Sequence, residues 1–97
     1  MSLMDTFQKL DAAIRILVSL DLPLPDRLET AIGALSPLKD RDLPPDCRKE
    51  FRLMHEKIQA YRDRGNDPDL RAGLALTMVD LYMEFLCNTG VCKEGQI

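Results

Sequence analysis

Apolar residues recur along most of the chain at alternating spacings of three and four, the pattern of helices that bury one face. The first such face is formed by Leu3, Phe7, Leu10, Ile14 and Leu17. A shorter one follows with Leu28, Ile32 and Leu35. The clearest one is formed by Cys47, Phe51, Met54, Ile58 and Tyr61. No segment alternates with a period of two over a useful length, so we expect no strands.

Proline and capping residues set the expected ends of the first two helices. The first helix should run from about Leu3 to Leu20, because the prolines of the following segment 21–26 lack an amide donor and disfavour helical geometry in the residues before them. Asp26 and Glu29 have the spacing of a capping pair, which predicts a second helix from Pro25 or Asp26 to Ser36.

Similar signals bound the second half. A third helix should begin near Pro45 and close at Gly65, which tolerates a left-handed cap. The pair Asp67–Pro68 opens a fourth helix, which should end near Asn88 or Gly90. We therefore predict an all-α fold with one domain over residues 1–90, followed by a short polar tail over 91–97. Short loops between four helices predict an up-down four-helix bundle with antiparallel neighbours.

The fourth helix is apolar on nearly every side. One stripe, expected to fill the core, comprises Leu70, Leu74, Met78, Leu81 and Phe85. A second apolar stripe comprises Ala72, Ala75, Leu76, Val79, Met83 and Leu86. The polar stripe comprises Asp69, Gly73, Thr77, Asp80, Glu84 and Asn88. Either this helix is central and touched by its three companions, or the second apolar stripe meets another chain. We expect the second arrangement, most simply a two-fold homodimer, with an unidentified protein partner as the other occupant of that face.

Composition narrows the class of protein. Of the 97 residues, 45% are hydrophobic and 30% charged, which is typical of a soluble globular domain. The net charge of −3 argues against a general polyanion binder. Polar residues near the start leave no room for a secretory signal, and Arg71, Asp80 and Glu84 interrupt the fourth helix too strongly for a membrane span. The odd count of 3 Cys favours free thiols and a cytoplasmic location. The second methionine, Met4, leaves two possible starts for the native chain.

Candidate chemistry is sparse. His55 is the single histidine, and no nucleophile–base arrangement or zinc-binding helix surrounds it in the sequence. The antiparallel register of helices three and four should bring Cys47 opposite residues 85–87, so that it and Cys87 lie at one end of the bundle with Cys92 nearby. Three thiols without a fourth ligand make an incomplete zinc site. We therefore expect no catalytic residue, no cofactor and no metal.

Two alternatives use the third helix. Residues 48–64 carry six cations and three carboxylates, a net charge of 6 − 3 = +3, which would suit a nucleic-acid-associated regulator if the cations shared a face. Arg48 and Arg52 do share one, but Glu56 continues the same row, so nucleic-acid binding is not expected. A phosphotransfer domain centred on His55 is the other alternative. The reading that fits most of the chain is a small non-enzymatic interaction or adaptor module that self-associates through its fourth helix.

Overall fold

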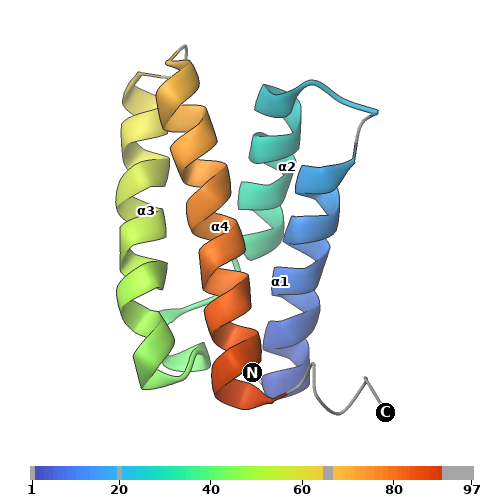
Figure 1. Cartoon of the computed structure of the whole chain (residues 1–97), viewed down its shortest axis with the longest axis vertical. Coiled ribbons are helices and arrows are strands. Elements are labelled where there is room, and N and C mark those ends of the chain that lie inside the picture. Colours follow the sequence, from blue (N-terminus) through green and yellow to red (C-terminus); the bar gives the residue numbers. More distant parts are fainter. Residues whose placement is uncertain (1, 20, 65–66, 91–97) are drawn as a thin grey trace.

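Four helices run alternately up and down in the computed structural model, which describes residues 2–19, 21–64 and 67–90 (Figure 1). They are α1 (Leu3–Val18), α2 (Leu24–Leu35), α3 (Arg48–Asp63) and α4 (Pro68–Thr89). Two short 3₁₀ turns, η1 (Asp40–Asp42) and η2 (Pro45–Cys47), interrupt the linker between α2 and α3. No strand occurs in the described ranges, so the predicted four-helix bundle is confirmed. The expected polar tail and the expected cap at Gly65 lie outside these ranges.

The starts of α1 and α4 follow the local chemistry, whereas those of α2 and α3 differ from the prediction. The third helix was expected to begin near Pro45, but a 3₁₀ turn, η2, occupies Pro45–Cys47 and α3 begins at Arg48. The Ser2 hydroxyl oxygen accepts a hydrogen bond from the Asp5 amide at 3.1 Å and so caps α1. The predicted capping role of Asp26 is wrong, because α2 begins at Leu24 and Asp26 lies within its first turn. Pro25 explains the difference: a proline in the first turn needs no amide partner, so the helix can begin before the acidic residue.

The helices form two hairpins that pack unequally. α1 packs closely on α2, and α3 packs closely on α4. α4 also lies against α1 and, over a smaller area, against α2, so it touches all three companions. α2 and α3 are consecutive in sequence, but their backbones approach each other closely at few points. Their buried side chains nevertheless belong to the same core.

The core contains the residues that the helical repeats predict, together with two leucines from the linker. All five apolar positions of the third predicted face are buried, as are the three of the second. Leu38 and Leu43, in the linker, are 4% and 2% exposed. Their burial ties the linker into the core at the end of the bundle where α1 begins.

The buried face of α1 is rotated relative to the predicted one. Leu3 was expected in the core but is 48% exposed, whereas Thr6 and Ala13 are 0% and 1% exposed. The linker accounts for the burial of Thr6, whose hydroxyl donates to the carbonyl oxygens of Ser2 and Asp42 at 3.1 and 3.3 Å. Because small side chains let the linker and α2 approach α1, the buried face is centred nearer to Thr6 and Ala13 than to Leu3 and Phe7.

Candidate functional site

The fourth helix is long and well bounded at both ends. Asp67 precedes it in an extended conformation, and its carboxylate accepts a hydrogen bond from the Asp69 amide at 2.9 Å. At the other end Gly90 has a φ of 71°, and its amide donates to the Leu86 carbonyl at 3.0 Å. Glycine adopts this left-handed conformation without a steric penalty. The 22 residues between these caps form a rod about 33 Å long.

One side of α4 fills the core as expected. Leu74, Met78, Leu81 and Phe85 are all at most 1% exposed, and Leu70 is half-buried near the start of the helix. Thr77 was expected on the polar stripe, which is wrong, because it is only 3% exposed.

Hydrogen bonds explain the burial of Thr77. Its hydroxyl donates to the Gly73 carbonyl at 2.9 Å and accepts a hydrogen bond from the Lys57 ammonium at 2.7 Å. A buried hydroxyl whose donor and acceptor capacities are both used avoids most of the desolvation cost. Lys57 thereby connects α3 to α4 and is not part of an open basic surface.

The second apolar stripe of α4 faces away from the core. Leu76 is two residues from both Leu74 and Met78, and Met83 is two residues from Leu81, which places each about 200° around the helix from buried neighbours. Leu76 and Met83 are 64% and 54% exposed. Ala72 is also exposed, and the other three members, which lie towards α1, are half-buried: Ala75, Val79 and Leu86. Packing of α4 on all three companions thus leaves half of this stripe exposed: Ala72, Leu76 and Met83.

A polar and aromatic contact fixes α1 beside this stripe. The Tyr82 hydroxyl donates to one carboxylate oxygen of Asp11 at 2.8 Å, and the Arg15 guanidinium donates to the other at 2.7 Å. The hydrogen bond from Arg15 is the main cause that lowers the pKa of Asp11. Burial opposes it, and the Tyr82 hydrogen bond lowers the pKa by a smaller amount than burial raises it. The Tyr82 ring stacks on Phe7 with 6.2 Å between ring centroids. Tyr82 and Asp11 are 71 residues apart in sequence, so no local pattern could have predicted the pair.

Two exposed apolar side chains of α1 lie on the side of that helix that contacts α4. Met4 and Val18 lie seven residues before and after Asp11, and seven residues make almost two turns, so all three share one side of α1. Met4 is 52% exposed and Val18 is 65% exposed. We call the combined set the α1/α4 surface; it comprises Met4, Val18, Ala72, Ala75, Leu76, Val79, Met83 and Leu86. Sequence analysis missed the two α1 members, which would have required knowing which side of α1 contacts α4.

The basic side of α3 is largely occupied by the linker. The Arg48 guanidinium donates to the carbonyl oxygens of Asp40 and Leu43 at 3.1 and 3.2 Å. Arg52 forms an ion pair with the Asp40 carboxylate at 2.6 Å. These are the two cations that share a face in the sequence, and both are engaged by the same segment. These hydrogen bonds and this ion pair hold the linker against α3.

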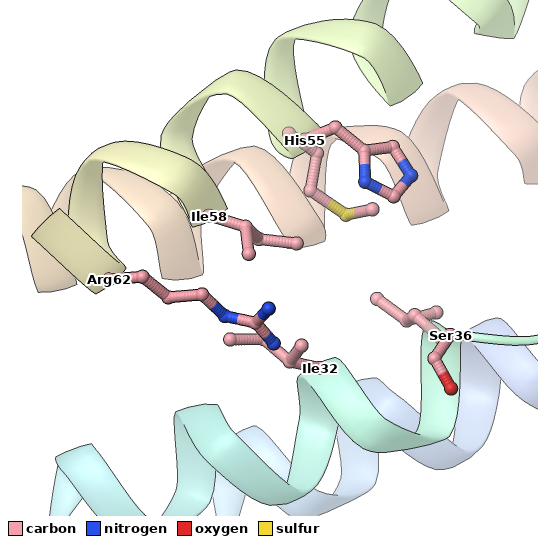
Figure 2. A pocket seen from close by; sticks show the side chains of 7 residues that line it. Ile32, Ser36, His55, Ile58 and Arg62 are labelled. Atoms are coloured by element: carbon pink, nitrogen blue, oxygen red, sulfur yellow. The ribbon is translucent and has the colours of Figure 1, made fainter.

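His55 is exposed on α3 at the edge of a groove between α2 and α3. Its ring meets Phe51 edge-on, with 4.5 Å between centroids. Within the described residues no carboxylate or hydroxyl forms a hydrogen bond with the imidazole, so the ring lacks the orienting partner that a general base needs. The groove has a volume of about 180 Å³. Figure 2 shows its lining, which comprises Ile32, Leu35, Ser36, Met54, His55, Ile58 and Arg62.

Cys47 lies against the end of α4, close to where the antiparallel register places it. Cys47 is fully buried, and its sulfur accepts a hydrogen bond from the Asn88 side-chain amide at 3.8 Å, one residue beyond the expected range 85–87. Burial is the main cause that raises the pKa of the Cys47 thiol, and the nearby carboxylates of Glu84 and Asp46 raise it further. Cys87 is an exposed free thiol. Cys92 lies outside the described residues, and within them no group of three or more His, Cys, Asp or Glu side chains could hold a metal ion.

Comparison with other proteins gives no further assignment: no protein-family model, curated protein or solved structure matches this chain. Over the part of the chain that the structure describes, no helix combines the length and apolar character needed to cross a bilayer.

Proposed function

We propose that this protein is a small, non-enzymatic helical interaction module that forms a two-fold homodimer through its α1/α4 surface in the cytoplasm. The observation that carries the proposal is the exposure of Leu76 and Met83, at 64% and 54%, directly opposite the core side of α4. Contiguous apolar patches of this kind usually mark contact sites, because leaving them in water is unfavourable. The free thiols of Cys47 and Cys87 are consistent with a reducing compartment.

The order of small and large residues on α4 supports a second copy of this chain as the partner. Ala72 and Ala75 lie seven and four residues before Val79, whereas Leu86 and Met83 lie seven and four residues after it. If two α4 helices pack antiparallel and cross at Val79, Ala72 meets the partner's Leu86 and Ala75 meets the partner's Met83. Two bulky side chains of the stripe, Met83 and Leu86, then each face an alanine, whereas Leu76 faces the partner's Tyr82. Small residues opposite large ones let two helices pack closely.

The size of the surface explains why α1 should take part. A stripe about 33 Å long and 10 Å wide covers roughly 330 Å², whereas a stable interface buries roughly 800 Å² on each partner. α4 alone is therefore too small. The neighbouring strip of α1, with Met4 and Val18 exposed, adds apolar area on the side where Tyr82 and Asp11 already hold the two helices together.

The first experiment measures mass. Light scattering at micromolar concentration should give twice the chain mass of 11.0 kDa, with a smaller value on dilution. Val79→Glu, at the centre of the stripe, should give a folded, less stable monomer. A clean 11.0 kDa species for the wild type up to several hundred micromolar would refute the dimer.

A second experiment tests the antiparallel register. In a background without the three native cysteines, Val79→Cys should form a disulfide-linked dimer under mild oxidation, because this residue lies at the two-fold axis and meets its own counterpart. Ala72→Cys is the matched control. Its counterpart lies opposite Leu86, about 21 Å away along the helix, so it should remain unlinked. If the Ala72→Cys variant cross-links as rapidly as the Val79→Cys variant, the two helices are parallel and the antiparallel register is rejected.

A further inference from the structure

A groove between α2 and α3 lies outside the proposed dimer surface. The backbones of α2 and α3 approach each other closely at few points, and the groove between the two helices has a volume of about 180 Å³. Ile32 and Leu35 form the α2 wall, and Met54 and Ile58 form the α3 wall; all four are at most 7% exposed. The walls of the groove are therefore apolar and consist of residues that are fixed in the core.

The polar groups of the groove are placed asymmetrically. Arg62 lies at one end and extends its guanidinium over the groove towards Ile32, whereas His55 and Ser36 lie at the other end (Figure 2). His55 and Arg62 are seven residues apart on α3, or about 10 Å along the helix. The apolar stretch between the two polar ends therefore accommodates a chain of only a few carbon atoms.

The cation at one end of the groove is Arg62. Arg15 and Arg52 are ion-paired with Asp11 and Asp40, but Arg62 has no ion-pair partner among the described residues. A guanidinium presents a planar pair of N–H donors that matches a carboxylate and carries the opposite charge. Above an apolar wall, the complementary group is one negative charge attached to a hydrocarbon.

We propose that this groove binds a small amphiphilic monocarboxylate with an apolar part of about six carbons. Its carboxylate pairs with Arg62, and its hydrocarbon lies between the α2 and α3 walls. The size supports a small ligand, since cavities of about 150 Å³ hold a benzene-sized group, and drug-sized ligands occupy roughly 300 Å³ or more. A ligand that binds the folded chain and not the unfolded one should also stabilise the fold.

The experiment is a titration of the full chain with hexanoate, followed through the methyl groups of its isoleucines. The methyl signals of Ile32 and Ile58, one on each wall, should shift and saturate with a Kd of about 0.1–1 mM, in the range expected for so small a ligand. The signals of Ile14 and Ile16 on α1 should stay in place and serve as internal controls. 1-Hexanol, which has the same number of carbon atoms as hexanoate but no charge, should bind at least tenfold more weakly.

A pair of variants tests the role of the charge. Arg62→Gln should weaken hexanoate binding at least tenfold and leave hexanol binding unchanged. The control is Arg64→Gln, because Arg64 is also an exposed cation and lies two residues after Arg62. This variant should bind hexanoate like the wild type. The proposal is overturned if Ile32 and Ile58 show no saturable shift up to 20 mM hexanoate (about twentyfold above the weakest expected Kd), or if Arg62→Gln binds as the wild type does. Because the groove lies on α2 and α3, either result leaves the mass measurement on the α1/α4 surface unaffected.

Discussion

Replacing Leu76 with glutamate tests the α1/α4 surface most directly, because this side chain is 64% exposed and contributes little to the core. In a monomer the change should alter the free energy of unfolding by less than about 0.5 kcal/mol, since the site is on the surface and both residues favour helix. A loss of association can then be separated from a loss of folding.

The effect on the dimer can be worked out from the exposed fraction. Full burial of a leucine side chain stabilises by about 1.5–3 kcal/mol, so burying the 64% that is exposed contributes about 1–2 kcal/mol for each chain. Leu76→Glu removes this contribution twice per dimer and also brings two carboxylates into a partly dehydrated contact, at a cost of at least about 1 kcal/mol each. The sum is at least about 4 kcal/mol, which raises the dimer Kd about 1000-fold.

Sedimentation velocity and thermal unfolding measure the two effects separately. Leu76→Glu should sediment as a monomer at concentrations where the wild type is a dimer, and circular dichroism should show an unchanged helical spectrum. Leu53→Glu is the matched control, because it places the same charge at a 36% exposed leucine on α3 and should leave the dimer intact. A dimeric Leu76→Glu, or an equal loss of dimer in both variants, would contradict the proposed surface.

Three further expectations concern the core, the pH dependence and the thiols. Leu81→Glu should unfold the chain, because it buries an unpaired charge at a 0% exposed site in a domain whose total stability is only about 5–15 kcal/mol; a cooperative thermal transition would oppose this. Asp11 has a pKa below its ordinary value of 3.8, so it should stabilise the fold above about pH 4 and lose that contribution as the pH falls through the lowered pKa. Its Asn variant should show a constant deficit in stability from pH 5 to 8 that shrinks below pH 4. In a Cys92→Ser background, Cys87 should react with a thiol reagent at least tenfold faster than Cys47, whose pKa is raised by burial, and equal rates would show that the lower end of the bundle opens.

The number, type and approximate ends of the helices can be predicted from local sequence patterns. Asp67, Pro68 and Gly90 bound α4 through interactions that span at most four residues, so they can be recognised without any tertiary contact. The buried face of α3 was predicted in full, since an apolar repeat of about 3.6 residues defines one side of a helix wherever the chain places it. The two-sided character of α4 was visible for the same reason.

Which of these helix faces is buried, and which segment covers it, depends on tertiary contacts. They rotate the buried side of α1 towards Thr6 and Ala13, and they bury Thr77 by giving its hydroxyl two hydrogen-bond partners. The position of α1 beside α4 added Met4 and Val18 to the candidate surface, and the separation of α2 from α3 left a groove beneath Arg62. A helical repeat fixes the angle at which a side chain leaves its own helix, but its burial depends on neighbours that the chain supplies from tens of residues away.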